Sequence, residues 1–92
     1  MKYIEFQWDE AKNTANKKKH NVSFEEAKTV FYDDNARLIH DPYHSETEDR
    51  YILLGMSNNI KLLIVIHTYK EQDEIIRIIS ARKATKKETK QY

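Results

Sequence analysis

The 92-residue sequence has no cysteine, one glycine and one proline. Without cysteine, the chain can form no disulfide, no thiolate nucleophile and no cysteine-ligated zinc site, so its stability must come from packing. A single glycine excludes a glycine-rich phosphate loop and the nucleotide sites that depend on one. We therefore expect a domain that carries no cofactor.

Long apolar runs and targeting signals are also missing. The most apolar stretch, residues 60–66, is interrupted by Lys61 and is far too short to span a bilayer. No segment at the amino terminus resembles a signal peptide. The length suits one compact domain over residues 1–92, which we expect to be cytoplasmic and to have no contact with membranes.

Positive charge is concentrated toward the two ends of the chain, although the net charge is only +1. Residues 77–92 contain six Lys or Arg and one acidic residue, whereas residues 21–50 contain three Lys or Arg and eight acidic residues. This asymmetry predicts a basic surface that binds a polyanion or an acidic partner. Solvated faces of opposite sign would give the same pattern, so the charge alone does not decide.

The first part of the chain has the pattern of a strand followed by a helix. Residues 3–8 alternate in polarity with a period of two, which is typical of a strand with one buried face. Asp9 is suited to cap a helix over residues 10–20. Asn21 is suited to end that helix, because asparagine tolerates the left-handed conformation.

A second helix is predicted to begin at Phe24, because Ser23 and Glu26 have the spacing of a capping box. Its apolar residues recur at helical spacing on one face, whereas the first helix offers mainly Ala11 and Ala15. The second helix should therefore contribute more to the core, and the first should expose more of its surface.

Strand patterns dominate the rest of the chain. They cover residues 36–41, 50–57, 61–69 and 74–82. Three consecutive strands with short connections favour an antiparallel meander. The last two strands are apolar on both parities, so they should be central and covered on both faces. Thr85 with Glu88 repeats the capping-box spacing and predicts a final helix from Lys86. The predicted fold is α+β, an antiparallel sheet with helices packed on it in the order β-α-α-β-β-β-β-α.

Two arginines interrupt the last strand pattern. Arg77 shares its parity with Ile75 and Ile79, and Arg82 follows on the other parity. A guanidinium stays charged in proteins, so its partial burial requires a carboxylate or a ligand anion beside it. An internal salt bridge would explain each arginine as well as a ligand would.

His67 lies on the preceding strand pattern, and the register of the hairpin decides which residue it faces. If the loop comprises residues 70–74, His67 lies directly opposite Arg77. With a loop one residue shorter, we expect His67 opposite Ile76 and the pair broken. The sequence leaves both registers open.

A metal site is not expected in this sequence. His40 and His44 are four residues apart, but Pro42 between them disfavours the helix that would bring them together. A turn in which Asp41 caps the local backbone explains the segment better.

The cations together suit a phosphate ligand. Arginine forks bind phosphate oxygens, lysines add point charges, and a histidine can move protons at neutral pH. Such groups would serve RNA cleavage, in which a 2′-hydroxyl attacks the adjacent phosphate without a metal. The candidate catalytic residues are Arg77, Arg82 and His67, and the candidate RNA-binding residues are Lys19, His20, Arg50, Lys83, Lys86 and Lys87. For the basic end of the first helix, the helix dipole is an equally good explanation.

Several stretches resemble one known family. The segments "FQWDEAKNTANKKKHNVSFEEA", "DPYHSETEDRYILLGMS", "LLIVIHTY" and "IRIISARKATKKE" resemble, in order and over nearly the whole chain, the BrnT toxins, the ribonuclease half of bacterial type II toxin–antitoxin pairs. By position, the family's "HT" motif falls on His67 and Thr68, and its "RIISAR" arginines fall on Arg77 and Arg82. Asn21 departs from the usual glycine, and Lys61 departs from the usual arginine.

The resemblance implies a RelE-like fold and an endoribonuclease that arrests growth. It also implies a partner, a BrnA-type antitoxin whose ribbon-helix-helix domain binds operator DNA, so that the toxin would reach DNA only through the antitoxin. Two other functions fit the sequence. A non-catalytic basic module would bind an acidic partner or nucleic acid, and a small interaction scaffold would bind neither. Cleavage of labelled RNA in the presence of a chelator would distinguish the enzyme from both.

Overall fold

The computed structural model describes residues 4–41, 49–72 and 74–92. The predicted helices and strands are present in the predicted order, with a short 3-10 helix added after the second α-helix. The elements are β1 (Glu5–Gln7), α1 (Glu10–His20), α2 (Phe24–Thr29), η1 (Val30–Tyr32), β2 (Arg37–Asp41), β3 (Arg50–Met56), β4 (Leu62–Lys70), β5 (Ile75–Lys83) and α3 (Lys86–Thr89). They form a small α+β domain, and the described part of the chain has no helix with the length and apolar character needed to cross a membrane.

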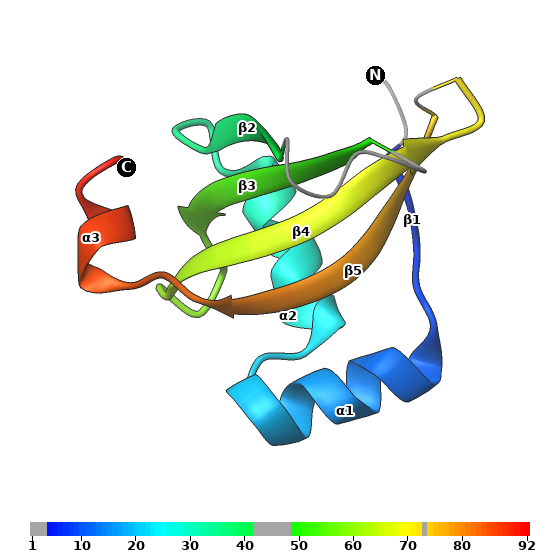
Figure 1. Cartoon of the computed structure of the whole chain (residues 1–92), viewed down its shortest axis with the longest axis horizontal. Coiled ribbons are helices and arrows are strands. Elements are labelled where there is room, and N and C mark those ends of the chain that lie inside the picture. Colours follow the sequence, from blue (N-terminus) through cyan, green and yellow to red (C-terminus); the bar gives the residue numbers. More distant parts are fainter. Residues whose placement is uncertain (1–3, 42–48, 73) are drawn as a thin grey trace.

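The five strands form one sheet in the order β1-β5-β4-β3-β2 (Figure 1). Strands β2 to β5 form an antiparallel meander. Strand β4 lies in its interior as predicted, whereas β5 is its last strand and is bordered by β1 over residues 75–77 only. However, β1 pairs with β5 in parallel, so the sheet is mixed and the prediction of an antiparallel sheet is wrong. A parallel pair needs a long crossover connection, which here contains all the elements between β1 and β5. The polarity pattern of a strand contains no information about the direction of its partner.

The predicted helix caps are confirmed. The Asp9 carboxylate accepts hydrogen bonds from the first backbone N–H groups of α1, and Asn21 ends this helix with a φ of 58°. The hydroxyl of Ser23 caps α2. At α3, both hydrogen bonds of the capping box between Thr85 and Glu88 are present. Short-range hydrogen bonds therefore set the helix limits as the sequence predicts.

The buried face of α1 differs from the prediction. Its buried residues are Asn13 and Asn16, which are 4% and 7% exposed, whereas Ala11 and Ala15 are exposed. The side-chain oxygen of Asn13 accepts the backbone N–H of Phe24 at 2.9 Å. The connection into α2 thus places polar backbone groups against α1, and buried groups of this kind need partners.

Asn16 joins α1 to the edge of β5. Its amide donates to the carbonyl of Val22 at 2.9 Å and to the carbonyl of Ala81 at 2.8 Å, and its oxygen accepts the N–H of Ala81 at 3.2 Å. One helix side chain therefore makes both of the hydrogen bonds that a neighbouring strand would offer Ala81.

The two faces of the sheet differ in composition. One face, which we call the helix face, packs against α2 and η1 to form the hydrophobic core. The core residues are Val22, Phe24, Ala27, Val30, Leu53, Leu63, Val65, Ile78 and Ala81. In Figure 1 this face is turned away from the viewer, with α2 behind the strands and α1 along the β5 side.

The opposite face, which we call the arginine face, is turned toward the viewer in Figure 1. Residues paired across neighbouring strands share a face, so the strand pairing identifies its members. They include Ile52 and Leu54 of β3, Ile64, Ile66 and Thr68 of β4, and Arg77, Ser80 and Arg82 of β5.

The single glycine, Gly55 of β3, lies directly against Val30 of η1 and against Ala36. A Cβ atom on Gly55 would lie 2.7 Å from Cγ1 of Val30 and 2.9 Å from Cβ of Ala36. Both neighbours are short side chains held in packed positions, so neither can move away cheaply. Gly55 is therefore required by the packing of the helix face rather than by a turn.

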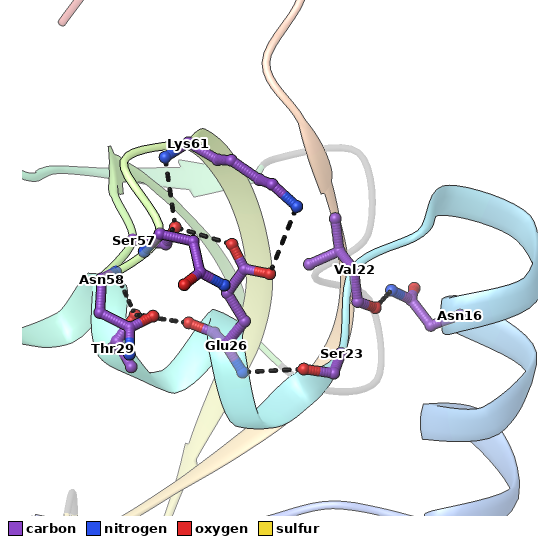
Figure 2. Close-up of polar contacts among 9 residues, drawn as sticks. Asn16, Val22, Ser23, Glu26, Thr29, Ser57, Asn58 and Lys61 are labelled. Atoms are coloured by element: carbon purple, nitrogen blue, oxygen red, sulfur yellow. Dashed lines mark hydrogen bonds and ion pairs between the residues drawn. The ribbon is translucent and has the colours of Figure 1, made fainter.

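The turn between β3 and β4 is fastened to α2 by a buried carboxylate (Figure 2). Glu26, which is 9% exposed, accepts the hydroxyl of Ser57 at 2.8 Å and lies 3.8 Å from Nζ of Lys61. The hydroxyl oxygen of Thr29 accepts the N–H of Asn58 at 3.0 Å. The Glu26 carboxylate thus faces the turn, whereas the predicted capping box would direct it back toward the start of α2.

Left-handed backbone positions are occupied by residues other than glycine. Asn21, Ile60, Glu71 and Gln72 have φ values of 58°, 59°, 53° and 56°. Ile60 is β-branched and 83% exposed, so its conformation costs about 1–2 kcal/mol without burying its side chain. The bonds of Figure 2, on either side of Ile60 in the turn, offset this cost.

Candidate functional site

A β-bulge places both candidate arginines on the same face of the sheet. Arg77 pairs with Thr68 and Arg82 pairs with Ile64, although the strict alternation of a strand would separate them. The pairing shifts between Ile66 and His67, where β5 contains one extra residue, Ile79. An extra residue reverses the alternation beyond it, so Arg82 returns to the face of Arg77. The sequence predicted Arg77 and Arg82 on opposite faces because it assumed an unbroken alternation along β5. The bulge at Ile79 breaks that alternation and places them on the same face.

Arg77 belongs to a polar row that crosses the sheet. It pairs with Thr68 of β4 on one side and with Gln7 of β1 on the other. On β3, Tyr51 pairs with His67, so the preceding residue, Arg50, lies beside Thr68. Two arginines thus flank Thr68 on one face, with backbones about 10 Å apart because neighbouring strands lie about 4.8 Å apart. The sequence identified Arg50 as an RNA-binding candidate, but it did not show that Arg50 and Arg77 lie on either side of Thr68.

The members of this row are held by hydrogen bonds from different elements. Nη1 of Arg77 donates to the side-chain oxygen of Gln7 at 3.2 Å. The hydroxyl of Thr68, which is 3% exposed, donates to the backbone carbonyl of Asp49 at 2.7 Å. Gln7 fixes one arm of the Arg77 guanidinium, and the remaining N–H groups suit an anion.

Arg82 is bound by a carboxylate of its own chain. Its Nη1 and Nη2 donate to the two oxygens of Glu88 at 2.7 Å and 2.9 Å, and Nη1 also donates to the carbonyl of Lys83 at 3.3 Å. The hydrogen bonds from Arg82 lower the pKa of Glu88 to about 2, and those bonds in turn raise the pKa of Arg82. The internal salt bridge that the sequence left as an alternative is present for Arg82.

His67 lies on the helix face, so the predicted placement opposite Arg77 is wrong. Strand β4 continues to Lys70, which pairs with Ile75, and this register sets His67 opposite Ile78. The alternative register, with His67 opposite Ile76, is also wrong, because Ile76 pairs with Tyr69. That register did correctly imply that His67 and Arg77 are not paired.

The surroundings of His67 are those of a core residue. Its side chain is 0% exposed, and the rings of Phe31, Tyr51 and Tyr69 lie 4.8 Å, 6.1 Å and 5.2 Å from it between centroids. Nδ1 lies 3.2 Å from the carbonyl of Val65 and must donate, because a carbonyl only accepts; Nε2 lies 3.2 Å from the hydroxyl of Tyr69. Burial lowers the pKa of His67 to about 4 and keeps the imidazole neutral.

The other basic candidates gather at the Arg82 end of β5. Arg77 and Arg82 pair with residues four positions apart on β4, which corresponds to about 13 Å along the strand. Lys19 and His20 form the last turn of α1, whose Asn16 is bonded to Ala81 at the same end. Lys83, Lys86 and Lys87 follow Arg82 directly, and all three are exposed. The arrangement therefore has two parts, the row of Arg50 and Arg77 and a basic end around Arg82.

The aromatic side chains of Trp8 and Tyr92 have partners within the domain, and part of the segment that contains His40 and His44 lies outside the described residues. The Trp8 ring packs against Phe24 at 6.1 Å, and the Tyr92 hydroxyl donates to Asp33 at 2.6 Å. Among the described side chains of residues 4–39, 49–72 and 74–92, no three from His, Asp or Glu are grouped as metal ligands. His44 and Pro42 lie outside the described residues, so the predicted turn there is not described.

Comparisons with known proteins agree with this architecture. Residues 8–88 match the family model described as ribonuclease toxin, BrnT, of type II toxin-antitoxin system. The fold is similar to the crystal structure of the Brucella abortus ribonuclease toxin BrnT, with a TM-score of 0.68 and 23% identity, covering 91% of this chain and 100% of that chain. No curated protein sequence matches the chain. The family model shows the family relationship, and the solved structure, at 23% identity, shows similarity of the fold.

Proposed function

Because the chain belongs to the BrnT family of ribonuclease toxins of type II toxin–antitoxin systems, we propose that it is an endoribonuclease whose substrate binds on the arginine face. The observation that carries this proposal is the row in which Arg50 and Arg77 flank Thr68. Two guanidinium groups on one face, each able to bind a phosphate oxygen, are suited to the charge that develops during phosphate cleavage.

The proposed reaction is internal attack on the phosphodiester bond. The 2′-oxygen of the RNA forms a bond to phosphorus as the bond to the 5′-oxygen breaks; the 2′-oxygen loses a proton and the 5′-oxygen gains one. Arg77, positioned by Gln7, binds the phosphate that is attacked and stabilises its added negative charge, and Arg50 binds it from the other side. His67 lies on the other face, so we leave it out of the catalytic set that the sequence suggested.

The basic end of β5 extends the RNA-binding surface. Arg82, Lys83, Lys86 and Lys87 bind phosphates on one side of the cleaved bond, and Lys19 and His20 add positive charge at the same end. A type II toxin has an antitoxin, and we propose a BrnA-like ribbon-helix-helix protein that links the toxin to operator DNA. A RelE-like relationship and a reaction that proceeds without metal ions belong to the same proposal.

Cleavage of labelled RNA tests this function directly. Purified protein is incubated with end-labelled RNA in excess chelator, beside the same sequence with 2′-O-methyl groups throughout. We expect cleavage of the first RNA and none of the second, because methylation removes the attacking oxygen. Salt-sensitive binding of both RNAs without cleavage would instead indicate the non-catalytic binding module. Cleavage only on addition of a divalent ion would contradict the metal-free part of the proposal.

A further inference from the structure

The contact between Arg82 and Glu88 has the geometry of an arginine bound to a phosphate. Both guanidinium arms meet both carboxylate oxygens, at 2.7 Å and 2.9 Å, which is the paired arrangement that arginine also forms with phosphate. The pair lies at the surface, because 38% of the Arg82 side chain and 29% of the Glu88 side chain are exposed. An incoming anion can therefore reach the guanidinium.

We propose that Arg82 is a second phosphate site for RNA, separate from the row of Arg50 and Arg77, and that the Glu88 carboxylate occupies it in the free protein. This inference rests on the proposed function. A phosphate group is much smaller than the 13 Å or so that separates Arg77 and Arg82 along the sheet. One bound strand therefore presents different phosphates to the two arginines, and only the phosphate at Arg82 must displace a carboxylate.

Displacement of Glu88 also affects α3. The same Glu88 oxygen that binds Arg82 accepts the backbone N–H of Thr85 at 2.8 Å, and the Thr85 hydroxyl oxygen accepts the N–H of Glu88 at 3.2 Å. The carboxylate therefore caps a helix of four residues and neutralises the arginine at once. RNA binding at Arg82 would exchange an internal ion pair for an external one and release Lys86 and Lys87 to follow the RNA.

The test uses Glu88→Gln, which removes the charge while keeping a side chain that can still serve in a capping box. The probe is a short single-stranded 2′-O-methyl RNA, which binds but cannot be cleaved by internal attack. Binding is measured by fluorescence anisotropy over a range of salt concentrations. At low salt we expect Glu88→Gln to bind about threefold to tenfold more tightly than the wild type, because one repelling charge is removed. The slope of log K against the logarithm of the salt concentration should steepen by up to about 0.7, which is the contribution of one phosphate contact on a single strand.

Three further variants separate the site from general effects of charge. Glu74→Gln removes an exposed carboxylate at the other end of β5 and should change binding less than Glu88→Gln. In a protein that already carries Arg82→Ala, Glu88→Gln should raise the RNA affinity by no more than Glu74→Gln does. The guanidinium for which Glu88 and RNA compete is then absent. Thr85→Ala weakens the helix cap without changing charge, and it should not reproduce the gain.

Three results would overturn the inference. The first is an equal gain in affinity from Glu88→Gln and Glu74→Gln, and the second is a gain from Glu88→Gln that persists without Arg82. The third is the same gain from Thr85→Ala, which would assign the effect to loosening of α3. All three are distinguishable from failure of the proposed function, which would show as absence of RNA cleavage by the wild-type protein whatever the binding data.

Discussion

Strands β4 and β5 present opposite chemistry on their two faces. On the helix face, His67 is enclosed by three aromatic rings and held neutral, because burial disfavours its charged form. On the arginine face, Arg77 and Arg82 remain partly exposed and charged, and each has an oxygen partner from another element. Residue type alone suggested that all three act together, whereas position in the sheet divides them into a core residue and two ligand-binding candidates.

The largest effect on this comparison is expected from Arg77→Ala. Loss of a group that stabilises transition-state charge should lower the rate of RNA cleavage about 100- to 1,000-fold. The free energy of unfolding should change by no more than about 0.5 kcal/mol, because the side chain is not in the core. Single-turnover cleavage and urea denaturation measure the two quantities. Arg77→Lys is the matched control, and its cleavage rate should lie between those of the wild type and Arg77→Ala. Lysine keeps the positive charge but cannot bind a phosphate with two parallel N–H groups. Full activity of Arg77→Ala would remove the arginine face from the mechanism.

The next largest effect is expected from His67→Gln, and it concerns stability. The pKa of His67 is about 4 in the folded protein against an ordinary value of 6.5, so the unfolded chain binds the extra proton between these values. Its contribution is therefore full above about pH 6.5 and is lost as the pH falls toward about 4. The wild type should lose about 3 kcal/mol more stability than the variant over this range, measured by urea denaturation.

Asn59→Ala, at an exposed position between β3 and β4, is the control for the histidine experiment and should keep the wild-type pH dependence of stability, because it changes no titratable group. Folded His67→Gln protein should still cleave RNA at neutral pH. A folded but inactive His67→Gln variant would return the histidine to the catalytic set and end the division between the two faces.

A smaller effect is expected from Gly55→Ala on the helix face. The added Cβ would lie 2.7 Å from Val30 and 2.9 Å from Ala36, so η1 must shift away from the sheet. Overpacking of this kind costs about 1–3 kcal/mol, which thermal or urea unfolding will show. Asn59→Ala, at an exposed position in the nearby turn, should cost much less. Cleavage per folded molecule should be unchanged in both variants. A loss of activity beyond the loss of folded protein would mean that the two faces are coupled.

The features that the sequence predicted well are those set by near neighbours in the chain. The caps at Asp9, Asn21 and Thr85 depend on residues within one turn, and the limits of β3, β4 and β5 follow from local polarity. The family resemblance was also carried by contiguous motifs, and the family model confirms it.

The features that the sequence did not predict depend on residues far apart. The parallel pairing of β1 with β5 joins the two ends of the chain, and the bulge at Ile79 becomes visible only when β4 and β5 are aligned. The row containing Arg50 and Arg77 depends on the pairing of three strands. The sequence pattern predicted apolar residues on the buried face of α1, whereas Asn13 and Asn16 are buried there. Their backbone partners belong to other segments, so the helix sequence alone could not show the need for them.

The bonds between Asn16 and Ala81 have a consequence for association between copies of the chain. Strand β1 pairs only with the first three residues of β5, Ile75 to Arg77, so two thirds of the nine-residue strand β5 extends beyond its partner. Unpaired strand edges are templates for another chain, and proteins protect them by covering or blunting them. Asn16 occupies both hydrogen-bonding groups of Ala81 from within a helix, which cannot itself accept a further strand. The polar inner face of α1 therefore works as a guard against edge-to-edge aggregation at the end of the sheet where the basic residues gather.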